Sequence, residues 1–295
     1  MIEVKDLTQT YRSGKGVFNL TFKVNEGEVF GYLGPNGAGK TTTIRNLMGY
    51  TNADSGNAFI NGIDCRKDAP KLQLSIGYLP GEMSFFNNMT GMEFLKFMGA
   101  LRKTKDRKRR DGLIDRLELD PAGKIKKMSK GMKQKLGLVT AFMHDPAVYI
   151  LDEPSSGLDP LMQVKLMQML KEEKSRGKTI MMSSHIFEEV QLICDRAGII
   201  REGKIVAIED VKALNAMKRD HFIITLSDAG DIEKILSSNL ETSQTGETQV
   251  SISVGKNYSQ MFGLLAKCNV VGMESLHQSL EDVFMKYYGK DGENQ

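Results

Sequence analysis

One glycine-rich loop constrains the fold of this chain more than any other feature. An apolar run at residues 28–33 precedes the loop and a helical pattern from about residue 40 to 49 follows it. Glycines let a backbone wrap closely around a phosphate, so that successive N–H groups and the N-terminus of the next helix face the anion. Lys40 then reaches the β- and γ-phosphates, and the Thr41 hydroxyl can ligate Mg²⁺. The loop reads Gly34-Pro35-Asn36-Gly37-Ala38-Gly39-Lys40-Thr41 and matches the pattern G-x-x-x-x-G-K-[ST].

Two acidic residues follow a second apolar run. Residues 147–151 predict a buried strand, and Asp152 and Glu153 come directly after it. The carboxyl end of such a strand lies at the sheet edge where α/β proteins bind ligands. Asp152 there suits a metal shell, and Glu153 suits a base for an attacking water. Strands also commonly end in acidic turns, so this interpretation depends on the phosphate loop.

The hydrophobic pattern predicts an α/β protein with two domains. Strand patterns occupy residues 1–34, residues 89–135 look mainly helical, and short apolar runs such as 179–182 alternate with helix-like stretches. This alternation is typical of a parallel core sheet covered by helices. From residue 219 the order becomes strand, helix, hairpin, helix, strand, helix (279–288). We therefore expect domains at 1–218 and 219–295, the second a small α/β unit, ferredoxin-like as one option.

Composition excludes several classes of protein. With 40% hydrophobic and 26% charged residues in 295, the chain reads as an ordinary globular protein. No apolar stretch approaches the roughly 18 residues of a membrane span, and the acidic opening does not resemble a signal peptide. The three cysteines are far apart, which favours reduced thiols over disulfides or a metal site. The basic excess of residues 1–218 is too weak to indicate nucleic acid as a partner.

Four further motifs decide which kind of phosphate-loop protein this chain resembles. Residues 128–134 read Met-Ser-Lys-Gly-Met-Lys-Gln just upstream of the acidic strand, and residues 156–159 read Ser-Gly-Leu-Asp. His185 follows two serines, and Tyr11 is an aromatic residue near the N-terminus. In this order they resemble the signature, D-loop, switch histidine and adenine-stacking aromatic of the ATP-binding cassette (ABC) family. The resemblance covers residues 1 to about 215.

The resemblance implies a P-loop NTPase fold of the ABC type, with a parallel core sheet, an N-terminal antiparallel β subdomain and a helical subdomain. It also implies that ATP and Mg²⁺ are bound between two subunits arranged head to tail, with the signature of each subunit completing the other's site. His185 is then a sensor of the γ-phosphate, or alternatively a neutral core histidine. The residues carried over are Lys40, Glu153 and His185 as catalytic; Tyr11, Asn36, Gly37, Ala38, Gly39, Lys40, Thr41, Thr42, Ser129, Gly131 and Asp159 as nucleotide-binding; and Thr41, Asp152 and Glu82 as metal-binding.

The chain departs from the family pattern at two places. In the signature, Met128, Lys130 and Met132 replace the commonest residues while Ser129 and Gly131 are retained, a version similar to that of type-2 ABC exporters. After Pro80, the family usually has a glutamine that ligates Mg²⁺, and here Gly81 stands in its place. Either Glu82 or a water then takes over that role. Residues 281–284 (Glu-Asp-Val-Phe) also look like those of exporter ATPases.

Two segments have open interpretations. Phe85 and Phe86 follow the loop where the family docks a helix of its membrane partner, but ordinary core packing is an equal alternative. The basic run at 102–110 is expected to be a solvated helix face, with anionic lipid headgroups as the sharper alternative.

The sequence thus predicts an ATP-hydrolysing subunit that works as a homodimer beneath a separate integral-membrane permease. The subunit is expected to lie peripherally at the cytoplasmic side of the cell membrane and to drive efflux of a peptide, drug or lipid-like substrate. The alternatives are a soluble ABC ATPase acting on nucleic acid or the ribosome, and an importer ATPase. Soluble ABC ATPases that act on DNA insert long coiled coils, which residues 41–128 lack.

Overall fold

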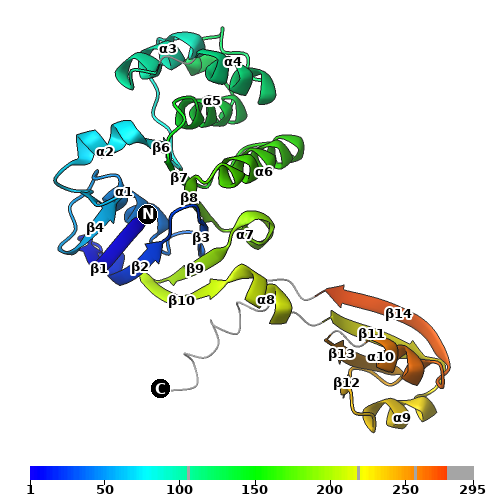
Figure 1. The fold of residues 1–295 in the computed structure, drawn as a ribbon. Helices are drawn as coiled ribbons and strands as arrows, with labels where there is room; N and C mark the ends of the chain where they lie inside the picture. Colours follow the sequence, from blue (N-terminus) through cyan, green and yellow to red (C-terminus); the bar gives the residue numbers. More distant parts are fainter. Residues whose placement is uncertain (105–106, 218–219, 256–257, 278–295) are drawn as a thin grey trace. The chain divides into compact units, whose positions relative to one another are not determined.

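The computed structural model describes residues 1–104, 107–217, 220–255 and 258–277, and the chain forms two compact units, Met1–Val211 and Lys212–Gln295 (Figure 1). The domain boundary expected between residues 218 and 219 lies outside the described residues. The same holds for the helix expected at 279–288 and for the motif at 281–284.

A six-stranded sheet forms the centre of the first unit. Its order is β10-β9-β3-β8-β7-β6, and all neighbouring pairs are parallel except β9 and β10. Every residue of β3 and of β7 is buried, because helices cover both faces of a parallel sheet. The expected parallel core sheet is confirmed. Its strands are β3 (Val29–Leu33), β6 (Ile76–Leu79), β7 (Val148–Asp152), β8 (Thr179–Ser184), β9 (Arg196–Arg201) and β10 (Lys204–Asp210), and its flanking helices are α1 (Lys40–Leu47), α2 (Ala69–Ser75), α6 (Pro160–Ser175) and α7 (Phe187–Ile193).

A four-stranded antiparallel sheet has the order β2-β1-β4-β5. Its strand β2 contacts β10 of the core sheet. Its strands alternate buried and exposed residues, as expected when one face is packed and the other is solvated. One hydrophobic cluster joins Leu20 of β2, Ile44 of α1 and Ile150 of β7, so the two sheets share a core. The strands are β1 (Ile2–Thr10), β2 (Gly16–Val24), β4 (Ser55–Ile60) and β5 (Ile63–Asp64).

Three helices form a separate layer of the first unit, visible as α3, α4 and α5 in Figure 1. A capping box between Thr90 and Glu93 begins α3, and the Ser129 hydroxyl caps α5. This layer confirms the helical subdomain expected from the resemblance. Its helices are α3 (Gly91–Leu101), α4 (Arg107–Arg116) and α5 (Lys130–Phe142), with a 3₁₀ turn at Ile125–Lys127.

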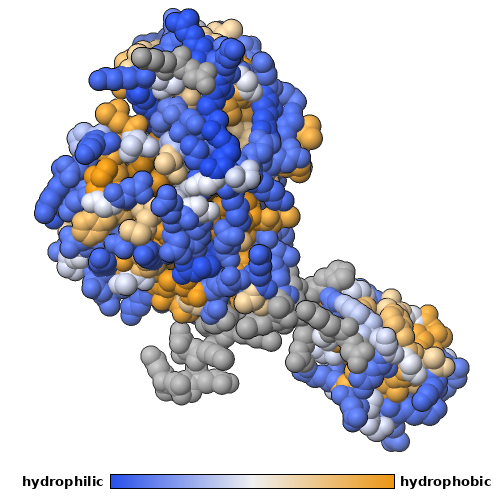
Figure 2. All heavy atoms as spheres, in the orientation of Figure 1, coloured by the Kyte–Doolittle hydropathy of each residue, from blue (hydrophilic) through white to orange (hydrophobic). Residues whose placement is uncertain are grey.

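The basic run is not a uniformly solvated helix face. The Arg109 guanidinium donates to a Glu173 carboxylate oxygen at 2.7 Å and to the Phe142 carbonyl oxygen at 2.9 Å. The Arg102 guanidinium donates to the Thr140 carbonyl oxygen at 2.6 Å. These two cations hold the helical layer together, and the exposed charges of the run lie on other residues. Figure 2 shows a largely hydrophilic surface in this view, with apolar residues in small groups.

His144 connects the helical layer to the core sheet, and its titration gives the fold a pH dependence. Its Nε2 lies 3.2 Å from the Ile76 carbonyl oxygen in β6, and its Nδ1 lies 3.1 Å from an Arg102 nitrogen. Burial first, and then the Arg102 charge, lowers the pKa of this imidazole from 6.5 to about 4. Because the unfolded chain takes up the proton at a higher pH, we expect the free energy of unfolding to fall as the pH drops from about 6.5 to about 4.

His144→Gln should flatten this decrease, since glutamine can keep a hydrogen bond but does not titrate. Urea unfolding of both proteins at a series of pH values measures the effect. Parallel losses of stability in the two proteins would contradict the assignment.

The second unit is a four-stranded antiparallel sheet with two helices. The element order is strand, helix, strand, strand, helix, strand, and the sheet order is β12-β13-β11-β14, which is the expected ferredoxin-like arrangement. The unit has its own hydrophobic core around Ile224, Ile235 and Ile252. Among the helices of the described residues, none is both long enough and apolar enough to span a bilayer. The elements are β11 (Asp220–Leu226), α9 (Ile232–Leu236), β12 (Glu241–Gln244), β13 (Gln249–Val254), α10 (Tyr258–Leu265) and β14 (Val270–His277), and α8 (Val211–Met217) precedes them.

Candidate functional site

The glycine-rich loop connects the carboxyl end of β3 to the first residue of α1, in the middle of the core sheet. Gly37 and Gly39 have positive φ angles of 81° and 114°, which side chains rarely adopt. A Cβ at Gly39 would also lie only 2.8 Å from a methyl group of Val17. Glycine is therefore required where α1 begins, and the backbone N–H groups at this helix terminus form an anion-binding surface.

Lys40 is a buried cation that is held inside its own loop. Its side chain is 5% exposed, and its Nζ donates to the Gly34 carbonyl oxygen at 2.6 Å and to the Pro35 carbonyl oxygen at 3.3 Å. The same Nζ lies 3.4 Å from Glu153 Oε1. A charge buried in this way requires anionic partners, and a bound phosphate would supply one beside the loop.

Asp152 ends β7 and is almost completely buried. Its carboxylate accepts hydrogen bonds from the Thr41 hydroxyl at 2.9 Å and from the Ser183 hydroxyl at 2.5 Å. The structure thus brings together two of the three residues predicted to bind metal, although they are far apart in sequence. A hydroxyl and a carboxylate are ligands that suit Mg²⁺, so these residues fit that ion.

Glu153 adopts a left-handed backbone conformation with φ of 49°, which is uncommon for this residue type and is often found at functional sites. Its amide donates to the Ser183 hydroxyl at 3.0 Å. Its carboxylate oxygen Oε1 lies 3.4 Å from Lys40 Nζ and 3.4 Å from His185 Nδ1. All three residues predicted to be catalytic therefore meet at one point.

Two residues that the sequence analysis did not select hold this acidic turn. Ser183 bridges Asp152 and the Glu153 amide, as described above. The buried side chain of Gln134 donates to the Pro154 carbonyl oxygen at 2.9 Å and lies 3.4 Å from that of Glu153. The position of Ser183 at the end of an adjacent parallel strand was a usable signal, whereas nothing in the local pattern around Gln134 indicated this contact.

A cavity of about 300 Å³ lies over the phosphate loop. Tyr11 lines it with 39% of its surface exposed, whereas Ala38 of the loop is buried and does not line it. A second cavity of about 230 Å³ shares Glu153 and contains His185. The predicted residues that line the first cavity are Tyr11, Asn36, Gly37, Gly39, Lys40, Thr41, Thr42 and Glu153.

Three predicted nucleotide-binding residues lie elsewhere. Ser129 caps α5 by accepting from the Met132 amide at 3.2 Å, and Asp159 caps α6 by accepting from the Met162 amide at 3.0 Å. A Cβ at Gly131 would lie 2.9 Å from the Gly157 carbonyl oxygen, so the start of α5 packs directly on the turn before α6. Glu153 lines both cavities described above. Neither cavity is lined by Ser129, Gly131 or Asp159.

Glu82 has no contact that supports its predicted role as a metal ligand. Its side chain is exposed and, within the described part of the chain, has no hydrogen bond or ion pair. Instead Gly81 lies against Asp152, because a Cβ on Gly81 would be 3.1 Å from Asp152 Oδ2. A side chain at position 81 would therefore crowd the Asp152 carboxylate, and glycine avoids that contact. The role of Glu82 stays a prediction.

Comparisons with known proteins agree with this geometry. Residues 17–156 match a protein-family model described as "ABC transporter". The linearmycin resistance ATP-binding protein LnrL of Bacillus subtilis is 31% identical over 98% of this chain and 99% of its own length. The bacitracin transport ATP-binding protein BcrA of Bacillus licheniformis is 33% identical over 98% of this chain and 97% of its own. A solved ATP-binding subunit of an ABC transporter has 30% identity and a TM-score of 0.67, covering 73% of this chain and 92% of that one.

A dimeric bacterial ABC transporter cassette also superimposes on this chain. Its TM-score is 0.65 over 72% of this chain and 99% of that chain, and at 23% identity the likeness concerns the fold alone.

Proposed function

This chain belongs to the ABC transporter family of ATPases, and from that premise we propose that it is the ATP-hydrolysing subunit of an exporter, working as a homodimer with a separate membrane permease. The observation that carries the proposal is that Lys40, Thr41 and Glu153 line one cavity at the phosphate loop, where Asp152 accepts a hydrogen bond from Thr41. Phosphoryl transfer to water requires a cation for the phosphates, oxygen ligands for a metal ion and a carboxylate beside the attacking water. Lys40, the Thr41–Asp152 pair and Glu153 can supply these groups.

We assign the following roles within one subunit. Lys40 and the loop amides bind the β- and γ-phosphates, and Tyr11 at the cavity wall stacks on adenine. Thr41 and Asp152 would hold Mg²⁺, which neutralises phosphate charge when bound. Glu153 orients and polarises the attacking water, and His185 beside it hydrogen-bonds the γ-phosphate. Positioning and charge stabilisation then supply most of the rate.

The second half of the site comes from another subunit. The start of α5, with Ser129 and Gly131, forms an anion-binding helix N-terminus that lines neither of the two cavities described above. Its close packing on Gly157 makes the signature and the D-loop one continuous surface. We infer that this surface closes over the phosphate loop of a second copy, so that ATP is bound between the two chains.

A mixing experiment tests this arrangement. Lys40→Ala disables one phosphate loop, Ser129→Arg blocks one signature, and each variant alone should be inactive. In a mixed dimer, the intact loop of one chain meets the intact signature of the other. We expect an equimolar mixture to recover ATPase activity, up to about a quarter of the wild-type rate if chains assort randomly and sites act independently.

The control is a mixture of Lys40→Ala with a Lys40→Ala, Ser129→Arg double variant, which contains no intact site. Ser129→Ala removes the hydroxyl cap of α5 without placing a large side chain there, and it measures how much of the inactivity comes from loss of the cap alone. If the first mixture stays as inactive as the second while both proteins remain folded, the site is not shared between chains.

The export part of the proposal rests on relatives named for linearmycin resistance and bacitracin transport. It implies a peripheral location at the cytoplasmic side of the membrane, with the permease attached. Phe86 and Phe97, which are 55% and 38% exposed and stack edge-on, offer an apolar surface for that partner. Sensitivity of a deletion strain to amphiphilic peptide and lipid-like antibiotics tests this part.

A further inference from the structure

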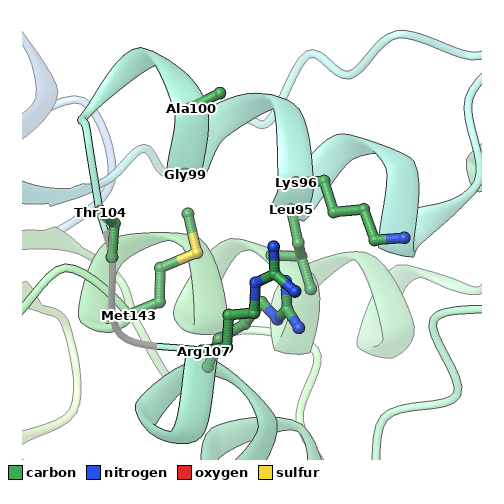
Figure 3. A pocket seen from close by; sticks show the side chains of 8 residues that line it. Leu95, Lys96, Gly99, Ala100, Thr104, Arg107 and Met143 are labelled. Carbon is green, nitrogen blue, oxygen red and sulfur yellow. The ribbon is translucent and has the colours of Figure 1, made fainter.

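A third cavity, separate from the phosphate loop, lies in the helical layer between α3, α4 and the end of α5 (Figure 3). Its volume is about 420 Å³. Leu95 and Met143 are buried side chains in its wall, and Gly99 leaves space beside them. In Figure 3 the Met143 side chain points toward α3 beside Gly99, and Arg107 lies close to Leu95. The inner wall of the cavity is therefore apolar.

Three cations surround this apolar wall. Lys96 comes from α3, and Arg107 and Arg110 come from α4. Arg110 is paired with Asp111, with 2.7 Å between Nη2 and Oδ1. Within the described parts of the chain, Lys96 and Arg107 have no ion pair, and none of the residues lining the cavity is acidic. The described lining of the cavity thus carries a net positive charge.

Thr104 supplies an unsatisfied polar group at the same place. The chain turns after α3 through a left-handed Lys103, and the Thr104 amide donates to the Gly99 carbonyl oxygen at 2.9 Å. This turn fixes Thr104 in the cavity lining, where its hydroxyl oxygen is buried and has no hydrogen-bond partner among the described residues. A buried hydroxyl without a partner costs free energy, and a rotation of the Thr104 side chain toward the cavity would let a bound ligand satisfy it.

We propose that this cavity binds a phosphate group carried by an apolar molecule, such as a phospholipid or another phosphorylated amphiphile. Lys96 and Arg107 line the cavity from different elements and supply the positive charge that attracts a phosphate. The wall formed by Leu95 and Met143 accommodates the apolar portion. The cavity over the phosphate loop shares no lining residue with this one. We therefore expect the phosphorylated amphiphile to bind without ATP.

Methionine methyl NMR of the full chain tests the proposal without nucleotide. Met143 lies in the cavity wall, and Met143→Leu identifies its signal among the isotopically labelled methionines. Monomeric dihexanoyl-phosphatidylglycerol should shift this signal and bind at least about 10-fold more tightly than dihexanoyl-phosphatidylcholine or inorganic phosphate. Glycerol phosphate, which lacks acyl chains, separates a lipid source from a small phosphorylated metabolite.

Two variants separate the cavity from general surface charge. Gly99→Leu fills the cavity and leaves every charge in place; a Cβ at Gly99 meets no atom within 4 Å, so the fold should tolerate it. We expect it to abolish binding while the basal ATPase rate is unchanged. Arg107→Gln should weaken binding roughly 10-fold, because a charge-assisted hydrogen bond is lost. Lys108→Gln is the matched control, since Lys108 is exposed on the same helix and does not line the cavity.

Three outcomes would each overturn the proposal. Equal affinity for the zwitterionic and anionic lipids would show that the cations play no part. Inorganic phosphate binding as tightly as phosphatidylglycerol would exclude a role for the apolar wall. Retention of binding in a folded Gly99→Leu variant would place the ligand outside this cavity.

Discussion

Replacing Glu153 by glutamine should preserve nucleotide binding while lowering ATP turnover by roughly 10²- to 10⁴-fold. Glutamine has nearly the same size as glutamate and can still contact water, but it cannot accept a proton. The backbone of residue 153 is held by Ser183 and Gln134, whose contacts do not involve its carboxylate. The loss should therefore come from chemistry rather than from folding, and steady-state phosphate release measures it.

The same substitution removes a negative charge that lies 3.4 Å from Lys40. Since that charge would repel a γ-phosphate, ATP affinity should stay constant or increase. Glu188→Gln is the control, because Glu188 is an exposed carboxylate in the first turn of α7, near the same sheet edge. Near-normal turnover in the Glu153→Gln protein, with normal ATP binding, would remove Glu153 from its assigned role.

The phosphate loop and the acidic pair were predictable for different physical reasons. The loop is contiguous, and its glycines at 37 and 39 are required by local backbone geometry. Asp152 and Glu153 were predictable because parallel strands present their carboxyl ends at one edge, so β7 brings Asp152 next to Thr41. In both cases a short sequence pattern identifies the end of a strand. The right-handed connections of parallel strands then bring those strand ends together at one edge of the sheet.

Contacts that depend on long-range packing were not predictable from the sequence. Gln134 contacts the turn after β7 only because the tertiary fold brings α5 beside that turn. Arg109 belongs to a charged run, yet its partner Glu173 is in α6, so no local pattern distinguishes it from its solvated neighbours. Charge is visible in a sequence, whereas burial of a particular charge depends on which helices meet.

Glu82 shows a third kind of limit. Its role was predicted only because it follows Gly81, which stands where the family usually has a glutamine. The position of a residue in the chain does not determine where its side chain points. The structure puts Gly81, with no side chain, against Asp152.

Replacing Lys40 by alanine should have the opposite signature to the Glu153 variant, because binding itself should fail. Lys40 Nζ is buried in the phosphate loop, and charge-assisted hydrogen bonds to phosphate are worth about 1.5 to 3 kcal/mol. Nucleotide affinity should therefore fall roughly 10- to 150-fold, and the stabilisation of the fold by ATP should shrink accordingly. Calorimetric titration and thermal unfolding with and without nucleotide measure both effects.

Arg45→Ala is the control, because Arg45 is an exposed cation of the same helix that does not line the cavity. This variant should leave nucleotide affinity unchanged. If a folded Lys40→Ala protein bound nucleotide with wild-type affinity, the Lys40 cation would not contribute to binding. The backbone amides of the loop would then bind the phosphates alone.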